Sequence, residues 1–389
     1  MKVCFFYDSV FRHGGVQRVM SLLINNLSKI YDVYIVCTEE IDKSKNVYNI
    51  DLDNITVLRR DIFKYNPKNK FALLRNRIVR NLVIIFNKNN FISKILSDLY
   101  YRNCVKNDLI EFINEEEFDV VIGAMMHFNL LLGNISNKVK AKVIGWEHNA
   151  FDAYFDEGRD FSDKKLLCKN LLGKLDYFIS LTKNDSEKYK KYLNINAEVI
   201  PNPISFRSME KSSLKNKNII TVGRLEYNKG SDYIVPILNE FCKLNDDWKL
   251  TIIGEGEMYT EVWNLIEKSN LQHRVSIKKF TNNIEEEYLK SSLYICTSRY
   301  ESFGLAVLEA MESGLPVVTF DTSGPSELIK KDACGITVDK FDIQGFAKAL
   351  NKLCQDEDLR TEKSKLALKR VNDFEIKDIV NKWNNIISR

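Results

Sequence analysis

The sequence lacks the long apolar segments that mark membrane and secreted proteins. No run approaches the ~18 uninterrupted apolar residues that a membrane-spanning helix needs, and a typical long run, residues 120–126, is bounded by Asp119 and His127. The apolar stretch at the N-terminus stops at Asp8, which makes it too short for the core of a signal peptide. We therefore expect a cytoplasmic protein.

Cysteine pairs at metal-binding or redox spacing are also missing. The eight cysteines stand at positions 4, 37, 104, 168, 242, 296, 334 and 354, so the chain contains no C-x-x-C motif. Zinc ribbons and thioredoxin-like redox sites are therefore poor interpretations. Cys4, Cys37 and Cys296 lie in apolar, strand-like runs, and we expect them to be reduced, buried thiols that pack as small hydrophobic side chains.

An excess of charge of one sign is absent as well. The 389 residues include 57 Lys and Arg and 53 Asp and Glu, a formal net charge of +4, so no strong field surrounds the whole molecule. With 44% hydrophobic and 28% charged residues, the composition is that of a globular protein and excludes disordered, collagen-like and coiled-coil classes. At ~150 residues per domain, the length predicts two or three domains.

What the chain does contain is a regular alternation of short β-branched or aromatic runs with amphipathic helical stretches. The expected strands are residues 3–7, 33–37, 55–58, 120–124, 143–146, 177–181 and 198–200, then 219–222, 250–253, 275–278, 294–297, 317–320 and 335–338. Their continuous apolar character predicts strands buried on both faces, in parallel sheets flanked by helices. Two such series predict two doubly wound α/β domains.

The expected boundary between the domains is Pro201-Asn202-Pro203, because proline ends a strand and stiffens a connection. The first domain then comprises residues 1–200 and the second residues 201–372. A last helix, residues 376–387, has Trp383 and Ile387 on an apolar stripe. We expect it to pack back on the first domain, so that residues 373–389 belong with that domain.

Residues 59–106 depart from the even distribution of charge, with twelve basic and two acidic residues and a local net charge of +10. Apolar residues recur at helical spacing among Arg75, Arg77 and Arg80, namely Leu74, Ile78, Leu82 and Ile85. A basic amphipathic segment can lie on an anionic membrane surface or contact phosphate groups. The alternative is a solvated helical insertion whose apolar stripe packs in the core. A nucleic-acid groove would need aromatic residues for stacking, and none lies between Arg75 and Arg80.

Two loops that follow strands have the composition of an anion-binding site. Gly14 and Gly15 follow the first strand and open the first helix, where glycine lets the backbone approach a ligand. The dinucleotide fingerprint G-x-G-x-x-G is absent, and a plain tight turn is the alternative. In the second loop, Arg224 and Lys229 stand five residues apart across a turn, so both cations can converge on one diphosphate. The alternative is two unrelated surface cations.

A third loop joins carboxylates to a helix N-terminus. Glu301 follows a strand, a helix is expected to open near Phe303, and Glu309 lies about two turns into that helix. Unpaired N–H groups of Gly304 and Leu305 would suit phosphate oxygens, and a carboxylate beside them would be balanced by sugar hydroxyls. The alternative is that Glu301 merely complements the helix dipole and Glu309 is solvated.

Taken in order, these motifs resemble family 4 of the retaining glycosyltransferases, also called glycosyl transferases group 1, whose members include bacterial surface-polysaccharide enzymes. The matching positions run from about Lys2 to Trp383 and are Gly14-Gly15, Pro201-Asn202-Pro203, Arg224, Lys229, Gly254-Glu255-Gly256-Glu257, Glu301 and Glu309 at E-x7-E spacing, and Gly314-Leu315-Pro316-Val317-Val318. The resemblance implies the GT-B fold, in which two Rossmann-like domains face a cleft and the C-terminal helix crosses back.

The resemblance also implies roles for individual residues. Arg224 and Lys229 would neutralise the diphosphate of a nucleotide-sugar donor, Glu301 would contact the sugar hydroxyls, and Glu309 would hold the ribose hydroxyls. His148, in Trp146-Glu147-His148-Asn149 after the fifth strand, would face the donor sugar, with His127 as the rival histidine. The remaining donor-binding assignments are Gly14, Gly15, Gly254, Lys278, Ser302, Phe303, Gly304 and Leu305. No cofactor is implied beyond the donor as co-substrate.

The expected chemistry needs no metal ion. Negative charge grows on the leaving diphosphate, and two fixed cations and a helix N-terminus would stabilise it. No D-x-D motif stands where a metal-dependent enzyme would use one, since Asp51-Leu52-Asp53 precedes the third strand and is typical of a turn. We expect same-face attack through an oxocarbenium-like state, retained anomeric configuration and no covalent role for Glu301.

The acceptor is expected to be a saccharide linked to a lipid diphosphate at the cytoplasmic face of the membrane, in the assembly of capsule, O-antigen or a similar glycan. The basic segment motivates this, and Arg75, Arg77 and Arg80 are assigned to the acceptor or membrane. The expected donor is a UDP-linked hexose or N-acetylhexosamine, and no nucleic acid is expected. The alternatives are a sugar-nucleotide epimerase of the same fold, a transferase with a soluble or protein acceptor, a nicotinamide dehydrogenase and a non-enzymatic binding protein.

Overall fold

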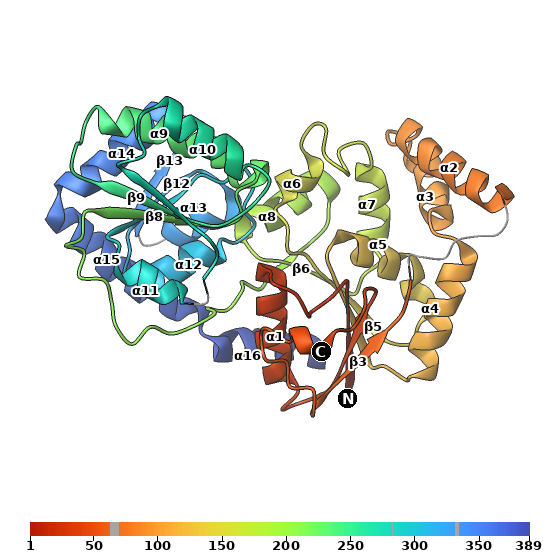
Figure 1. The fold of residues 1–389 in the computed structure, drawn as a ribbon. Helices are drawn as coiled ribbons and strands as arrows, with labels where there is room; N and C mark the ends of the chain where they lie inside the picture. The colour runs from red at the N-terminus through yellow and green to blue at the C-terminus, as the bar shows by residue number, and fades with distance from the viewer. Residues whose placement is uncertain (63–69, 282, 331–333) are drawn as a thin grey trace. The chain divides into compact units, whose positions relative to one another are not determined.

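The computed structural model describes residues 1–62, 70–281, 283–330 and 334–389. The chain folds into two compact units. Unit 1 comprises Met1–Pro203 and Ile376–Arg389, and unit 2 comprises Ile204–Glu375. Each unit is an α/β sandwich around a parallel sheet (Figure 1).

The sheet of unit 1 has seven strands in the order β3-β2-β1-β4-β5-β6-β7, and every pairing is parallel. The strands are β1 (Lys2–Tyr7), β2 (Asp32–Cys37), β3 (Ile55–Arg59), β4 (Val120–Ala124), β5 (Lys142–Trp146), β6 (Tyr177–Ser180) and β7 (Glu198–Val199). The four middle strands β1, β2, β4 and β5 are buried almost throughout, which explains their continuous apolar sequences.

The helices of unit 1 are α1 (Gly15–Leu27), α2 (Lys70–Ile85), α3 (Asn90–Leu99), α4 (Asn103–Glu115), α5 (Met126–Ile135), α6 (Phe151–Phe155), α7 (Lys165–Leu172), α8 (Lys183–Lys188) and α16 (Ile376–Ser388). The last of these returns to unit 1 at the end of the chain. Its Trp383 packs edge-on against Trp146 with ring centroids 4.9 Å apart, and the Lys142 ammonium donates to the carbonyl of Ile387 at 3.0 Å. Both contacts attach α16 to strand β5.

The sheet of unit 2 has six parallel strands in the order β10-β9-β8-β11-β12-β13. The strands are β8 (Asn218–Val222), β9 (Lys249–Ile253), β10 (Val275–Lys278), β11 (Leu293–Cys296), β12 (Val317–Phe320) and β13 (Gly335–Val338). The helices are α9 (Ser231–Cys242), α10 (Tyr259–Lys268), α11 (Ile284–Leu289), α12 (Leu305–Glu312), α13 (Ser323–Lys330), α14 (Ile343–Gln355) and α15 (Glu357–Val371). Helices α9, α10 and α14 cover one face, and α11, α12 and α15 cover the other (Figure 1).

The expected doubly wound α/β class is confirmed. All thirteen expected strands form, and nine of them differ from the expected range by one residue at one or both ends. The helix expected near Phe303 begins at Leu305. Cys4, Cys37 and Cys296 are free and buried in strands, as the sequence predicted.

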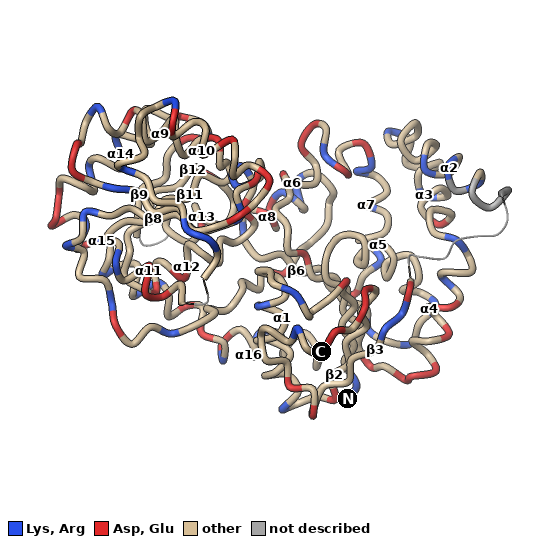
Figure 2. Tube along the Cα trace, viewed as in Figure 1, with Lys and Arg blue, Asp and Glu red and all other residues tan. Residues whose placement is uncertain are grey.

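The basic segment 59–106 does not form one surface. Arg60 pairs with Asp108 at 2.9 Å and stacks on the Phe112 ring, and the buried Lys106 donates to the Asp98 carbonyl, so these cations serve packing. Lys64 and Lys68 lie outside the described residues. Among the described cations that remain exposed, Arg77 and Arg80 lie on α2, Lys88 lies between α2 and α3, and Lys94 lies on α3. Figure 2 shows Lys and Arg but no acidic residue along α2.

Three of the four apolar residues that recur along α2 are exposed rather than packed. Leu74, Ile78 and Ile85 expose 55%, 48% and 68% of their surface, and only Leu82 packs against a core cluster. At 100° per residue these three side chains share one stripe, with Arg75 and Arg77 on either side of it. The alternative, in which this stripe packs in the core, therefore does not hold for three of its four residues.

Candidate functional site

The candidate donor residues of unit 2 follow strands at one edge of its sheet. Strands β8 and β11 are neighbours although β9 and β10 lie between them in sequence, so the strand order reverses here. Ligands of open parallel sheets bind beside the carboxyl ends of the strands at such a reversal. Arg224 follows β8 and Glu301 follows β11, whereas Gly254 and Lys278 belong to the ends of β9 and β10.

Lys229 and Glu301 form the central ion pair of this edge, with the ammonium 2.5 Å from Glu301 Oε2. Partial burial alone would lower the pKa of Lys229, but the charge of Glu301 and the hydrogen bond to it prevail and raise that pKa. Lys229 therefore stays a cation. The pair places a fixed positive charge and a carboxylate at one point, which suits a ligand that has both phosphate and hydroxyl groups.

The loop that contains Lys229 is held by residues that the sequence analysis did not identify. Arg299 makes two 2.6 Å bonds to Asp232, and its guanidinium lies 3.9 Å from the centre of the Tyr227 ring. Gly230 has φ = 63°, and a Cβ there would lie 1.9 Å from the Thr297 carbonyl oxygen, so only glycine fits. These contacts fasten the loop after β8 to the loop after β11. An arginine directly after a strand and an aspartate in a first helical turn are too common to have signalled this.

Arg224 does not share a partner with Lys229. Its side chain is 76% exposed and pairs with Glu226 at 3.1 Å, whereas Lys229 pairs with Glu301. Each cation thus has its own carboxylate partner, and the convergence of the two on one diphosphate stays a prediction. Arg224 has the freedom to turn toward a ligand at the edge of the sheet.

The expected E-x7-E motif spans a loop and a helix. Glu301 precedes Gly304, which caps α12 with φ = 93°, and Glu309 lies in the second turn. Glu309 is 5% exposed, and its Oε1 accepts a 2.5 Å bond from Ser205. The alternatives of a helix-dipole role for Glu301 and a solvated Glu309 do not fit these positions.

The other residues assigned to the donor site lie around this edge. Ser302 and Leu305 are half-buried, and Phe303 is buried against the Phe374 ring. Gly254 lies so close to the Gly223 backbone that a Cβ would come within 1.8 Å of its carbonyl oxygen. Lys278 donates to Glu287 at 2.7 Å.

The glycine loop of unit 1 lies at the carboxyl edge of its own sheet. Strands β1 and β4 are neighbours across the reversal of strand order in that sheet, and α1 begins at Gly15 after the loop that follows β1. The Gly14 N–H donates to the Tyr48 hydroxyl at 3.0 Å. This bond fixes the backbone of the loop where the strand leads into the helix.

The two candidate histidines follow the neighbouring strands β4 and β5. His127 is partly exposed, with its Nε2 3.3 Å from Asp8. His148 is buried, and its ring lies 4.1 Å from the Trp146 ring. None of the described residues bonds its Nε2.

A buried carboxylate, which the sequence analysis did not single out, holds the backbone at His148. Glu147 Oε1 accepts bonds from the His148 N–H at 2.9 Å, the Asn149 N–H at 3.0 Å and the Tyr154 hydroxyl at 3.0 Å. Burial raises the pKa of Glu147 to about 7, although these donors oppose the shift. Burial lowers the pKa of His148 to about 3, so its ring is neutral at pH 7.

Glu147 predicts a specific dependence of stability on pH. Its ordinary pKa is 4.5, so between about pH 4.5 and 7 the folded protein keeps a proton that the unfolded chain has released. Stability from this group is therefore lost as the pH rises through that range. Glu147→Gln does not titrate, so from pH 5 to pH 8 it should gain stability relative to the wild type by roughly 2–3 kcal/mol.

Chemical denaturation of both proteins across this pH range measures the difference. The low pKa of His148 acts in the opposite direction, since the unfolded chain binds a proton there below about pH 6.5. Both proteins share that effect, and it cancels in the comparison. A difference in unfolding free energy that stays constant from pH 5 to pH 8 would show that Glu147 does not titrate in this way.

Among the residues that the structure describes, no group of three or more His, Cys, Asp or Glu side chains is placed to hold a metal ion. Across the same ranges, no helix has the length and apolar content needed to cross a membrane.

Residues 205–370 match the family model described as glycosyl transferases group 1. This range is nearly all of unit 2 and a little under half of the chain. It contains Arg224, Lys229, Glu301 and Glu309.

Three relatives align over most of their own length. An uncharacterized glycosyltransferase of Haemophilus influenzae is 26% identical over 99% of this chain and 99% of that protein. The amylovoran biosynthesis glycosyltransferase AmsD of Erwinia amylovora is 26% identical over 100% and 99%. The N-acetylgalactosamine-N,N'-diacetylbacillosaminyl-diphospho-undecaprenol 4-alpha-N-acetylgalactosaminyltransferase of Campylobacter jejuni is 26% identical over 93% of both chains.

Solved structures resemble the whole chain. TarM of Staphylococcus aureus has a TM-score of 0.75 at 16% identity and covers 100% of this chain and 99% of its own. HepE of Anabaena, crystallised with UDP, has a TM-score of 0.75 at 16% identity and covers 100% of both. At this identity the likeness shows the fold, and the expected GT-B fold is confirmed.

Proposed function

We propose that this glycosyltransferase of the GT-B type moves a hexose or N-acetylhexosamine from a nucleoside-diphosphate sugar to a saccharide in the synthesis of a bacterial surface polysaccharide. The observation that supports it most is the Lys229–Glu301 pair, a cation and a carboxylate 2.5 Å apart at the reversal point of the unit 2 sheet. This pair lies within the range that matches the glycosyltransferase family model.

The bound donor is proposed to separate Lys229 from Glu301 and to give each of them a new partner. Its diphosphate takes the Lys229 ammonium and is also approached by the exposed Arg224, while the Glu301 carboxylate turns to accept bonds from sugar hydroxyls. Glu309 accepts bonds from the ribose hydroxyls. UDP is the first nucleotide to test, since HepE was crystallised with it.

The transfer is proposed to retain the anomeric configuration and to need no metal ion. The bond between the sugar C1 and the diphosphate oxygen breaks, and its electron pair stays on that oxygen. Lys229 and Arg224 stabilise the growing charge. The acceptor hydroxyl attacks the same face of the sugar, and its proton passes to the departing diphosphate. Glu301 stays non-covalent, and the neutral His148 faces the donor sugar.

The acceptor is proposed to be linked to a lipid diphosphate at the cytoplasmic face of the membrane. The Campylobacter relative acts on a diphospho-undecaprenol-linked saccharide, and AmsD acts in amylovoran biosynthesis. The exposed stripe of α2 with its flanking arginines is the geometry of a helix that lies in a membrane interface. Phe91, the second residue of the neighbouring helix α3, is 77% exposed.

Charge reversal on α2 tests the membrane contact. Each basic residue near an anionic surface contributes about 1 kcal/mol, so the triple variant Arg75→Glu, Arg77→Glu, Arg80→Glu should weaken binding to vesicles at least about 100-fold. The measurement is co-sedimentation with vesicles of equal parts phosphatidylglycerol and phosphatidylcholine. A control variant reverses three exposed lysines of unit 2, Lys215, Lys243 and Lys268. Equal vesicle binding by the two variants would rule out α2 as the membrane contact.

A donor screen tests the proposed reaction. Nucleoside-diphosphate release is measured with a panel of sugar nucleotides, followed by mass and anomeric analysis of the product. We expect one donor class to be consumed only when a saccharide acceptor is present, with the anomeric configuration retained. Interconversion of the free sugar nucleotide without transfer to any acceptor would instead identify a sugar-nucleotide epimerase.

A further inference from the structure

The segment that enters unit 2 is bound along helix α12. Ile204 is the first residue of the unit, and its N–H donates to the Phe374 carbonyl at 2.8 Å. Four of the seven residues that follow contact two carboxylates of α12, Glu309 and Glu312, which lie nearly one turn apart. We call residues 205–211 the brace.

One end of the brace is anchored on Glu312. The side chain of this glutamate is 3% exposed, and Arg207 Nη1 contacts its Oε2 at 2.5 Å. Its Oε1 accepts bonds from the Lys211 ammonium at 2.6 Å and the Ser208 N–H at 3.0 Å. Both oxygens of a buried carboxylate are thus balanced by cations, which fixes the brace to the helix.

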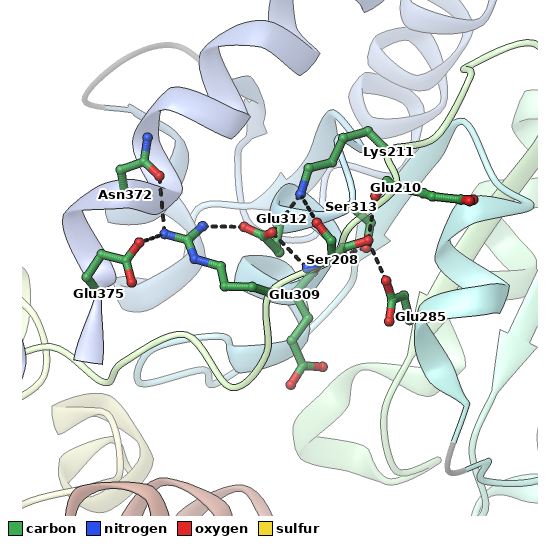
Figure 3. A network of polar contacts seen from close by, with 10 residues as sticks. Ser208, Glu210, Lys211, Glu285, Glu309, Glu312, Ser313, Asn372 and Glu375 are labelled. Carbon is green, nitrogen blue, oxygen red and sulfur yellow. Dashed lines mark hydrogen bonds and ion pairs between the residues drawn. The ribbon is translucent and has the colours of Figure 1, made fainter. Parts of the chain in front are cut away.

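Arg207 also reaches the residues at the end of unit 2. Its Nη2 donates to Asn372 Oδ1 at 3.2 Å and contacts the Glu375 carboxylate (Figure 3). The guanidinium therefore joins α12 to the segment that leads into α16. Because the planar guanidinium is bonded to three different side chains, it restricts the conformation of the brace at Arg207.

The other end of the brace contacts Glu309 itself. Ser205 Oγ donates to Oε1 at 2.5 Å, and the Tyr288 hydroxyl lies 3.5 Å from Oε2. An ionised carboxylate has about four acceptor positions, so one carboxylate can accept bonds from a serine hydroxyl and from ribose hydroxyls together. The same bond fixes the rotation of the carboxylate about its terminal torsion, which is otherwise broad.

We propose that Ser205 is a positioning residue for donor binding, which acts by holding the Glu309 carboxylate in the orientation that accepts the ribose hydroxyls. The proposal rests on the proposed function, since Glu309 is taken as the ribose-binding group. The Glu312 anchor holds Ser205 in register with Glu309. Ser205 itself makes no bond to the nucleotide.

Calorimetric titration of the full-length protein with a nucleoside diphosphate tests this role. UDP, ADP and GDP are titrated into the wild type, and the tightest ligand is used for all variants. Ser205→Ala should weaken its binding about fivefold, because a hydrogen bond from a neutral donor to a charged group is lost. Ser205→Thr keeps the hydroxyl and should restore most of the affinity. Ser213→Ala, at an exposed serine outside the brace, is the control and should bind as the wild type does.

A double-mutant cycle with Glu309→Gln separates positioning from direct contact. If Ser205 acts through the carboxylate, Ser205→Ala should change affinity less than about twofold in the Glu309→Gln background. An equal loss in both backgrounds would show that Ser205 contacts the nucleotide directly and would overturn the proposal. So would a Ser205→Ala variant that binds as Ser213→Ala does while Glu309→Gln binds weakly. If Glu309→Gln binds as the wild type does, the ribose assignment of the proposed function fails as well.

Discussion

Lys229→Ala is expected to lower kcat/KM by a factor that corresponds to about 2–4 kcal/mol of lost transition-state stabilisation. This is the range for removing a preorganised group that stabilises charge in the transition state. The reason is that Lys229 remains charged beside Glu301 at the edge of the unit 2 sheet. Its loss removes the charge that balances the leaving diphosphate. Steady-state kinetics with the donor found in the screen, together with UDP binding, measure the effect, and both should weaken.

Lys243→Ala is the matched control for Lys229→Ala. Lys243 pairs with Glu240 on the surface of α9, where an ion pair contributes little, so its loss should leave kcat/KM nearly unchanged. Lys229→Arg keeps the charge and should recover part of the activity. Turnover in Lys229→Ala equal to that of the control would remove Lys229 from the diphosphate site.

Glu301→Gln is expected to separate sugar recognition from nucleotide binding. It should lower kcat/KM by a factor that corresponds to about 2–3 kcal/mol of lost transition-state stabilisation, because bonds from sugar hydroxyls to a charged acceptor become bonds to a neutral one. UDP, which has no donor sugar, should bind as tightly as before or more tightly, since Lys229 loses the carboxylate that competes for it. In this one variant, kcat/KM should therefore fall while the affinity for UDP stays the same or rises.

The matched control is Glu362→Gln, which removes one charge from an exposed position of α15. It should leave both kcat/KM and UDP binding unchanged. If Glu301→Gln weakened UDP binding and turnover equally, Glu301 would serve the structure of the loop rather than the donor sugar. If it changed neither, the carboxylate would have no part in the site.

The sheets were predictable because their strands are buried on both faces. A strand such as β4 is apolar at nearly every position, and this pattern does not depend on what lies far away in the sequence. The start of helix α1 was also predictable, because Gly14 and Gly15 mark it in the sequence. The start of α12 was placed two residues early, because a left-handed Gly304 delays the helix to Leu305.

The partners of the candidate site residues could not be predicted. Lys229 and Glu301 are 72 residues apart, and they meet only because β8 and β11 pair across the reversal of strand order. The same holds for Glu309 and Ser205, which are 104 residues apart. A sequence of isolated polar residues does not show which of them the sheet brings together.

Burial of polar groups was equally hard to foresee. The tetrapeptide Trp146-Glu147-His148-Asn149 drew attention to the histidine, yet it is the buried Glu147 that binds the backbone on either side of the His148 carbonyl. On α2 the helical spacing left both a surface and a core position open, and three of the four apolar residues lie on the surface. Whether a residue is buried depends on its neighbours in space, which periodicity alone does not supply.

The most direct test of the account is a crystal structure of the protein with an intact sugar nucleotide bound. The account predicts that the diphosphate oxygens lie within hydrogen-bonding distance of Lys229 Nζ and that the Arg224 guanidinium has turned from Glu226 toward them. The sugar hydroxyls should meet the Glu301 carboxylate. A diphosphate bound away from both cations would contradict the claim that Lys229 and Arg224 bind the leaving group.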